Sequence, residues 1–349
     1  MSRFDHESFL TDRLRELCPR QTKIGHGHGR GHGCNGAPSA RLRTLRTEPS
    51  AAELESCVKL PQSAGQSSSD TQGVKRVQLF EFEDQAWFPD WIRVLMTRYI
   101  MTLHRLLGTA DEVAELIARA LKHTGLKQVN DLCSGHGGPF REVLKALRER
   151  HGLADVQVTL SDLFPNPDVV ASFNDEGEGI HYRPDPVDAR APGDLAEGLR
   201  SMVCSLHHMR PAVVRDILSS AAAARQPFLA YEISDNSAPR FLWWTAVPIG
   251  GLMTLLLTLL VRPLALGQVV FTYLIPVLPV LIGWDGGVSN ARTYGEADLN
   301  LLLAEVPAEG YRWEIGTLGK GPTKRLYLLG LPELPVGLLG RPDSRPEST

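Results

Sequence analysis

The sequence of 349 residues predicts an α/β fold, in which helices cover both faces of a largely parallel sheet. A short apolar run ends at the acid Asp131 and is followed by a glycine-rich turn and a helix that begins near Pro139. The apolar residues of that helix recur at a period near 3.6, as on a helix with one buried face. A second strand, Asp155–Ser161, ends at another acid, Asp162. This order of strand, turn, helix and strand forms a βαβ unit, from which parallel sheets are built.

The glycine-rich turn contains Gly135, Gly137 and Gly138 and is suited to ligand binding. Glycines let the backbone approach a ligand closely, and the N-terminus of the next helix offers free amide groups. A carboxylate at the tip of the second strand, here Asp162, can accept both hydroxyl groups of a ribose. The alternative is that the glycines only form a tight turn and that Asp162 only caps the next segment. Because all these features lie in order within one βαβ unit, we favour ligand binding.

The spacing of the turn narrows the choice of ligand. A phosphate loop would end in Gly-Lys-Ser/Thr, which this turn lacks, and a dinucleotide fingerprint would read Gly-x-Gly-x-x-Gly. The pattern here is Asp131-x-x-x-Gly135-x-Gly137-Gly138, which resembles motif I of the class I S-adenosylmethionine-dependent methyltransferases. Asp162 matches the ribose-binding acid of that family. Asp188 stands where the family places its adenine-contacting acid.

The resemblance extends over roughly residues 107–331. It implies a Rossmann-like seven-stranded methyltransferase sheet, methyl transfer as the reaction and S-adenosylmethionine as the cofactor. A narrower resemblance, to a bacterial group with an apolar insertion after strand five, rests on the patterns at Glu83–Pro89, Asp131–Gly135, Ser205–His208 and Trp284–Gly286. The residues that the resemblance assigns to cofactor binding are Asp131, Cys133, Ser134, Gly135, Gly137, Gly138, Asp162, Leu163, Asp188, Ala189 and Ser205.

The other elements follow from hydrophobic periodicity and alternation. Thr109 and Glu112 have the spacing of a capping box at the start of a helix, and the segment from Asp162 to Tyr182 is expected to be rich in loops. The final hairpin is expected from the resemblance. Further helices are predicted at Trp91–Leu106, Pro211–Arg225 and Tyr294–Val306, and further strands at Arg200–Leu206, Pro227–Ile233, Tyr311–Gly316 and Lys324–Gly330.

These elements divide the chain into six parts. We expect a disordered N-terminal tail at 1–75, a helical cap at 76–108, the cofactor-binding core at 109–239, an apolar insertion at 240–285, the rest of the core at 286–333 and a disordered tail at 334–349.

In the first tail, His26–Cys34 could chelate a metal, but its spacing matches no structural metal site. We therefore predict no metal.

Composition narrows the class of partner. The net charge of −3 and pI near 6.4 give no general attraction to nucleic acid, and no basic stretch is interleaved with aromatic residues. Five scattered cysteines do not make a disulfide framework, and the first residues lack the apolar core of a signal peptide. We expect a cytoplasmic protein that binds no nucleic acid, and the sequence leaves its oligomeric state open.

The insertion contains one charged residue, Arg262, between Arg240 and Asp285. Its two apolar runs, Phe241–Val261 and Leu264–Trp284, are each long enough to cross a bilayer core of about 30 Å. Prolines and paired glycines interrupt both runs. Three interpretations remain: a membrane hairpin, a helical pair within one leaflet, or a buried lid and dimer contact in a soluble enzyme. We favour membrane association through 241–284, which makes a small hydrophobic or lipid-like acceptor the expected substrate.

The catalytic candidates lie at the ends of strands four and five. His207 and His208 follow strand four, on the side where open α/β sheets bind ligands, and histidine titrates near neutral pH. Glu232 is the second candidate for a general base. A purely structural role for the two histidines has equal weight. The residues predicted to bind the acceptor are Glu83, Trp87, Trp284, Asp285, Arg292 and Tyr294.

The leading interpretation is therefore an S-adenosylmethionine-dependent methyltransferase with an unidentified small or hydrophobic acceptor, acting at a membrane. One alternative is a membrane-tethered nucleotide-binding module without catalysis. Another is a nicotinamide-dependent oxidoreductase, which the glycine spacing disfavours.

Overall fold

The computed structural model describes residues 73–333, apart from 75, 86, 176, 178, 238, 321–323 and the side chain of Arg240. The predictions for the two tails, including the His26–Cys34 stretch, lie outside the described residues, except at the very end of the first tail.

One seven-stranded sheet has the order β3-β2-β1-β4-β5-β7-β6. The first five strands are parallel, β7 runs antiparallel to β5, and β6 runs antiparallel to β7. The predicted Rossmann-like methyltransferase sheet is thereby confirmed. The strands are β1 (Gln128–Leu132), β2 (Gln157–Ser161), β3 (Ile180–Tyr182), β4 (Leu199–Val203), β5 (Phe228–Glu232), β6 (Tyr311–Leu318) and β7 (Arg325–Pro332).

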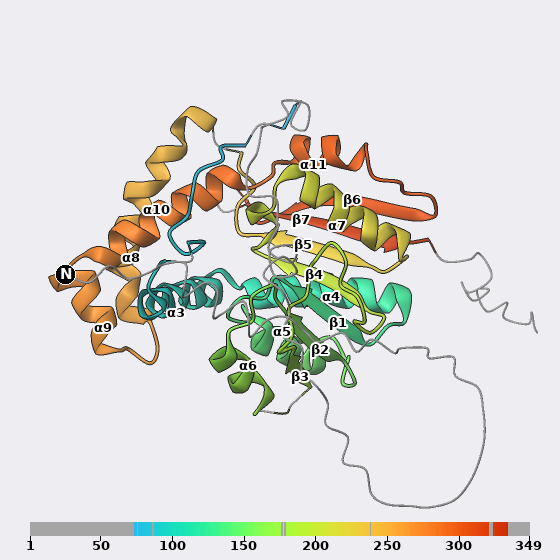
Figure 1. The fold of residues 1–349 in the computed structure, drawn as a ribbon, viewed down its shortest axis with the longest axis horizontal. Helices are drawn as coiled ribbons and strands as arrows, with labels where there is room; N and C mark the ends of the chain where they lie inside the picture. The colour runs from blue at the N-terminus through green and yellow to red at the C-terminus, as the bar shows by residue number, and fades with distance from the viewer. Residues whose placement is uncertain are drawn as a thin grey trace, which may run out of the picture. The chain divides into compact units, whose positions relative to one another are not determined.

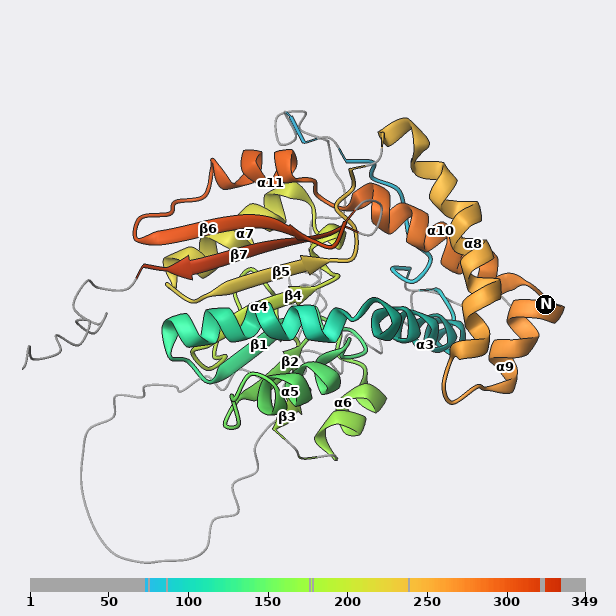
Figure 2. The ribbon, with the colours of Figure 1, turned by 180° about the vertical axis from the view of Figure 1, so that it is seen from behind.

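Helices cover both faces of the sheet (Figures 1 and 2). On one face, α4 (Thr109–Thr124), α5 (Phe140–Glu149) and α6 (Pro167–Asn174) bury their apolar residues against β1, β2 and their neighbours. On the other face, α7 (Pro211–Ala223) and α11 (Glu296–Leu303) pack on the sheet around Met202 and Phe228. Both sides of the parallel strands are buried, as parallel sheets require.

Two sequence predictions about local structure are wrong. The segment after Asp162 contains α6, whose start is capped by the Asn166 side chain accepting from the amides of Asp168 (3.0 Å) and Val169 (3.3 Å). Its only buried side chain is that of Phe173, which is too little for a helical pattern. The predicted capping box at Thr109 is absent because Gly108, in a left-handed conformation, is the N-cap residue. 

The segment that follows β5 forms a helical insertion beyond the carboxyl ends of the parallel strands (Figure 2). Within it, Phe241–Leu260 is one helix long and apolar enough to cross a membrane, and it is mostly exposed. The next apolar stretch is bent by 85° between Leu266–Leu274 and Val277–Arg292, so it forms no straight span. The insertion consists of η2 (Arg240–Thr245), α8 (Ala246–Leu257), η3 (Thr258–Leu260), α9 (Leu266–Val269), η4 (Val270–Leu274) and α10 (Val277–Arg292).

Close packing of α8 on α10 depends on glycines. A Cβ atom on Gly283 would lie 2.5 Å from the carbonyl oxygen of Val247 and 2.9 Å from the amide nitrogen of Gly251. Gly250 and Gly287 make similarly close approaches across the same pair of helices. The other side of α10 packs on α3 (Asp90–Leu107) through a cluster that includes Phe88, Tyr99, Leu278 and Ile282. The insertion is thus fixed to the cap helix by apolar packing.

We predict that Gly283→Ala destabilises the protein by about 1–3 kcal/mol, because its methyl group overpacks the contact between α8 and α10. Thermal unfolding measures this as a fall in Tm of several degrees. Gly286→Ala is the matched control, because a Cβ at that position meets nothing within 4 Å. The control should raise Tm slightly through its higher helix propensity. Equal Tm values for the two variants would contradict the close packing.

Candidate functional site

The glycine-rich turn between β1 and α5 forms a tightly held loop at the end of the sheet. Ser134 Oγ donates to Asp131 Oδ2 (2.6 Å), and the Tyr182 hydroxyl donates to the carbonyl oxygen of Gly135 (2.8 Å). Gly137 has a φ of +86°, and a Cβ there would lie 2.2 Å from the Phe173 ring. Only glycine fits beside the Phe173 ring, whereas a Cβ on Gly135 or Gly138 would meet nothing within 4 Å, so the loop presents bare backbone before α5.

Asp162, at the tip of β2, bonds directly to this loop. Its Oδ2 atom accepts the amide of Gly135 (2.9 Å) and its Oδ1 atom accepts the amide of Phe164 (2.9 Å). Each carboxylate oxygen has a second lone pair that can accept from a ligand hydroxyl. Leu163 is exposed beside it. The structure therefore brings together the predicted ribose-binding acid and the predicted glycine turn.

Asp131 is buried beneath the loop, and its carboxylate accepts hydrogen bonds from Ser134 and Ser201 (2.7 Å). Burial raises the pKa of Asp131 to about 7, although both hydroxyl groups oppose this rise and the charge of Asp162 adds to it. At neutral pH, this carboxyl group is close to half protonated. It holds the loop in place rather than facing solvent.

Other predicted cofactor residues lie at the ends of neighbouring strands. Asp188 forms an ion pair with Arg190 (2.6 Å), which lowers the pKa of Asp188, and Ala189 is buried next to it. The Cys133 and Cys204 backbones both turn through positive φ, +58° and +54°, directly after β1 and β4. Ser205 follows, and its buried Oγ atom has no hydrogen-bond partner among the described residues. A buried hydroxyl of this kind is suited to bind a polar ligand group.

His207 and Glu232 form a buried pair. The Nδ1 atom of His207 lies 2.8 Å from Glu232 Oε2, and its backbone amide donates to Glu232 Oε1 (3.1 Å). The carboxylate therefore fixes the ring with Nε2 pointing away from it. That Nε2 atom is buried and has no hydrogen-bond partner in the described part of the chain. The two predicted catalytic residues are thus one unit, in which Glu232 orients His207.

His208 belongs to a charged cluster beside this pair. Its Nδ1 atom lies 3.0 Å from Asp84 Oδ1, and Arg292 bridges Asp84 (2.8 Å) and Glu81 (3.0 Å). Burial opposes the charged form of His208, but the Asp84 hydrogen bond and the charge of Glu81 raise its pKa to about 9. Burial likewise opposes ionisation of Asp84, yet His208 and Arg292 lower the pKa of Asp84 well below its usual range. His208 is therefore an imidazolium at neutral pH.

The predicted acceptor residues divide into two groups. Trp284 and Asp285 hold the segment before α3: Trp284 Nε1 donates to the Phe80 carbonyl (3.0 Å), and Asp285 accepts the amides of Phe82 (2.8 Å) and Glu83 (3.2 Å). Burial raises the pKa of Asp285 to about 7 against these two hydrogen bonds, and burial also raises the pKa of Glu83. Trp87 is exposed and contacts the Phe82 and Phe88 rings.

Tyr294 is placed differently from the other acceptor candidates. Its ring lies under the Arg76 guanidinium at 4.4 Å, and its hydroxyl donates to the carbonyl oxygen of Met209 (2.6 Å). Arg76 also donates to the carbonyl oxygens of Met209 (2.7 Å) and His207 (2.6 Å). Both side chains therefore support the backbone of the histidine turn, the short 3-10 helix Leu206–His208.

Sequence reasoning did not assign Glu81, Asp84 and Arg76 to the site. Glu81 is fully buried, accepts from Ser289 Oγ (2.9 Å) and forms an ion pair with Arg292. The dense run of acids and aromatics around it was the available signal. Nothing in that run shows which acid points inward, because its described residues before Asp90 form neither a strand nor a helix and so have no periodicity.

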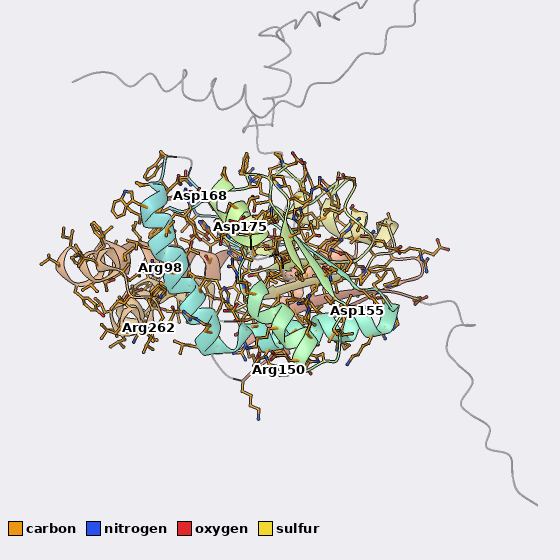
Figure 3. The ribbon with its side chains drawn as sticks, turned by 90° about the horizontal axis from the view of Figure 1, so that it is seen from below. Arg98, Arg150, Asp155, Asp168, Asp175 and Arg262 are labelled. Atoms are coloured by element: carbon orange, nitrogen blue, oxygen red, sulfur yellow. The ribbon has the colours of Figure 1, made fainter. Side chains whose placement is uncertain are left out.

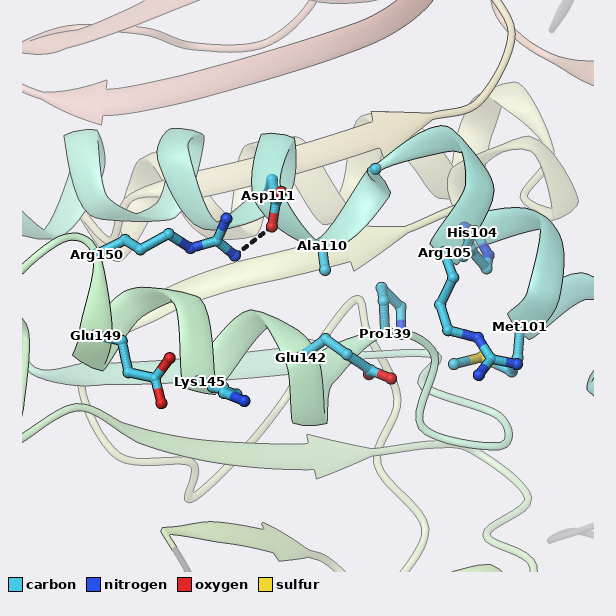
Figure 4. A pocket seen from close by; sticks show the side chains of 11 residues that line it. Met101, His104, Arg105, Ala110, Asp111, Pro139, Glu142, Lys145, Glu149 and Arg150 are labelled. Carbon is cyan, nitrogen blue, oxygen red and sulfur yellow. Dashed lines mark hydrogen bonds and ion pairs between the residues drawn. The ribbon is translucent and has the colours of Figure 1, made fainter. Parts of the chain in front are cut away.

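A surface cavity of about 290 Å³ lies between α3–α4 and α5 (Figure 4). It is lined by charges of both signs, and Arg150 and Asp111 form an ion pair across it. None of the predicted site residues lines it. The cavity is therefore separate from the cluster at the strand ends.

No protein-family model and no curated protein matches the chain. Solved structures with a similar fold include an O-methyltransferase family protein from Burkholderia thailandensis (14% identity, 65% of this chain, 57% of that chain, TM-score 0.38). Another is magnesium protoporphyrin IX methyltransferase from Synechocystis with bound SAH (12% identity, 64% of this chain, 83% of that chain, TM-score 0.35). A third is human N-acetylserotonin methyltransferase in complex with SAM (16% identity, 66% of this chain, 55% of that chain, TM-score 0.35). The chain spans little more than half the length of the first and third. These TM-scores are too low to support a functional argument.

We predict that Asp131→Asn removes part of the pH dependence of stability. Because burial raises the Asp131 pKa to about 7, the folded protein holds a proton that the unfolded chain releases near pH 4. Stability therefore falls as the pH rises from about 4 to about 7, by up to about 1.4 kcal/mol per pH unit. The Tm of Asp131→Asn minus the Tm of the wild type should therefore increase as the pH rises over this range, because only the wild type loses this contribution. Asp155→Asn, at an exposed carboxylate, is the control. Parallel pH profiles for Asp131→Asn and wild type would contradict the assignment.

Proposed function

We propose that this protein is an S-adenosylmethionine-dependent methyltransferase that acts on a small or hydrophobic acceptor. The observation that carries the proposal is the contact between Asp162 and the Gly135 amide. It joins the acid of β2 to a glycine loop at the carboxyl edge of a sheet whose strand order is that of the class I methyltransferases. Ligands of open α/β sheets bind at this edge.

The residues present fit this cofactor. A Cβ on Gly135 or Gly138 would meet nothing within 4 Å, so the bare backbone there is open to a ligand, and the buried Ser205 hydroxyl is available as a hydrogen-bond donor. Asp162 would bind the ribose and Asp188 the adenine. When bound, S-adenosylmethionine supplies an electrophilic methyl group on a sulfonium. The chain then has to align the acceptor and exclude water, which is the main protein contribution to an in-line displacement.

His207 and Glu232 are the groups that we assign to activation of the acceptor. Glu232 holds the His207 ring through Nδ1, so that the buried Nε2 atom just past the end of β4 keeps a free lone pair. Such a lone pair can assist the loss of a proton from an acceptor hydroxyl, amine or thiol. His208, held as an imidazolium by Asp84, is suited to a positioning role instead.

We predict that the protein binds S-adenosylmethionine and that Asp162→Asn weakens binding at least about tenfold, because a ribose hydroxyl loses its charged acceptor. Titration calorimetry of the purified full chain measures the affinity. Asp168→Asn is the matched control, since Asp168 is an exposed acid on the next helix (Figure 3). Binding of a nicotinamide cofactor in place of S-adenosylmethionine would favour an oxidoreductase. Binding without turnover on any acceptor would favour the nucleotide-binding module.

We infer that the insertion contacts the cytoplasmic face of a membrane by entering one leaflet. Large apolar side chains are exposed along it, among them Leu266 (78%), Leu274 (76%) and Phe241 (75%). The C-terminal half of α10 carries two buried charged side chains, which cannot enter lipid. Asp285 binds the amides of Phe82 and Glu83, and Arg292 belongs to the charged cluster. Together with the 85° bend, this favours shallow insertion over a span. Figure 3 shows Arg98 and Arg262 on the side of the molecule that carries the insertion. Arg98, on α3, also donates to the carbonyl oxygen of Pro263 and so links the cap helix to the insertion.

We predict that the wild type sediments with vesicles of phosphatidylcholine and phosphatidylglycerol. The double variant Leu266→Glu/Leu274→Glu should lose at least about tenfold in vesicle binding, since burial of one leucine contributes about 1.5–3 kcal/mol. Leu301→Glu is the control, because Leu301 is 45% exposed but lies on α11, outside the insertion. If the double variant sedimented as fully as the wild type, membrane contact through the insertion would be excluded.

A further inference from the structure

Two buried polar atoms converge beside the histidine turn. Glu81 is 0% exposed and His207 is 6% exposed, and neither Glu81 Oε2 nor His207 Nε2 has a hydrogen-bond partner among the described residues, although Glu81 Oε2 lies 3.6 Å from His208 Nδ1. A buried polar atom without a partner costs about 1–3 kcal/mol, and more when the group is charged. Two such atoms in one place therefore indicate a ligand that binds both.

His208 completes the group. One atom each from Glu81, His207 and His208, a carboxylate oxygen and two ring nitrogens, lie within 4.8 Å of one another. The three residues come from the segment before α3 and from η1 (Leu206–His208), at the end of β4. Atoms bound to one tetrahedral metal ion at about 2.1 Å lie about 3.4 Å apart. Side-chain shifts of about 1 Å would bring these atoms to that spacing.

The surroundings of both histidines resemble those of metal ligands. The Nδ1 atom of His207 bonds to Glu232 Oε2 (2.8 Å), and the Nδ1 atom of His208 bonds to Asp84 Oδ1 (3.0 Å). A carboxylate on one ring nitrogen fixes the tautomer and directs the other nitrogen to the metal, an arrangement common around metal-bound histidines. On Glu81, Ser289 and Arg292 contact Oε1, whereas Oε2 lies 3.6 Å from His208 Nδ1. That distance is an ion-pair contact longer than a hydrogen bond, so Oε2 keeps its lone pairs for a cation.

We propose that Glu81, His207 and His208 bind a divalent first-row transition-metal cation. Two imidazoles and one carboxylate suit Zn²⁺, Fe²⁺ or Mn²⁺, whereas Ca²⁺ and Mg²⁺ prefer oxygen ligands throughout. A cation that binds here displaces the proton that His208 carries at neutral pH. The carboxylates of Glu81, Asp84 and Glu232 then outnumber the guanidinium groups of Arg76 and Arg292, which contact this cluster.

The role of this cation depends on the proposed function, whereas cation binding itself does not. Three protein ligands leave coordination positions open for an acceptor oxygen, sulfur or nitrogen. A bound cation lowers the pKa of a coordinated hydroxyl group, so the acceptor loses its proton near neutral pH. His207 would then activate the acceptor through the metal ion, and Glu232 would be a positioning residue.

The test is titration of the metal-free full chain with Co²⁺, followed by its visible absorption, and with Zn²⁺ by calorimetry. The chain used carries His26→Ala, His28→Ala, His32→Ala and Cys34→Ser, because that stretch could bind the same ions. We expect one Co²⁺ per chain at micromolar affinity or better. Glu232→Gln should weaken Co²⁺ binding about 10–100-fold, and His207→Gln or Glu81→Gln should weaken it further. His181→Gln, at an exposed histidine on β3, should have no effect.

Absence of a stoichiometric Co²⁺ signal would overturn the proposal. So would binding that His207→Gln and Glu232→Gln leave unchanged, which would assign the cluster a structural role. If Glu81→Gln unfolds because Arg292 loses its buried partner, the two other variants still decide the outcome. S-adenosylmethionine titration of the same metal-free sample separates the two proposals. S-adenosylmethionine binding without Co²⁺ binding overturns only the cation site. Co²⁺ binding without S-adenosylmethionine binding overturns only the proposed methyltransferase function.

Discussion

The buried ion pair of Arg292 with Glu81 and Asp84 joins three parts of the chain that are far apart in sequence. Arg292 ends the helix that returns from the apolar insertion, the two acids lie in the segment before α3, and Asp84 also holds His208 at the end of β4. Arg292 is 4% exposed and Glu81 is 0% exposed, so loss of either partner would leave a buried charge, at a cost of about 3–5 kcal/mol. The position of the insertion and the geometry of the histidine turn therefore depend on one another.

Much of the fold could be predicted from the sequence because its signals are local. The glycine spacing from Gly135 to Gly138, the apolar period of α5 and the acids at the tips of β1 and β2 all lie within one βαβ unit. The misses had weak local signals. Helix α6 buries only Phe173, and Thr109 had a capping pattern that the left-handed Gly108 made unnecessary. In both cases the deciding feature was packing or backbone geometry rather than composition.

The candidate site could be predicted less completely, because some of its contacts join residues 124 to 208 positions apart in the sequence. The glycine loop and Asp162 were found from spacing, and His207, His208 and Glu232 from their places at strand ends. Glu81 was not found, since no pattern distinguishes it from Glu83 two residues later. Only tertiary packing shows that Glu81 points to Arg292, while Glu83 meets Asp285 through its backbone amide.

The same packing connects the insertion to the chemistry. Helix α10 begins at Val277 among apolar residues and ends at Arg292 in the charged cluster, so one rigid helix joins the exposed apolar surface to the residues beside His207. The glycine contacts with α8 and the apolar contacts with α3 hold that helix in place. An acceptor drawn from a lipid leaflet along α10 would travel from an apolar surface toward the His207 Nε2 atom. If the proposed function holds, this arrangement accounts for the place of the apolar segment between β5 and the rest of the sheet.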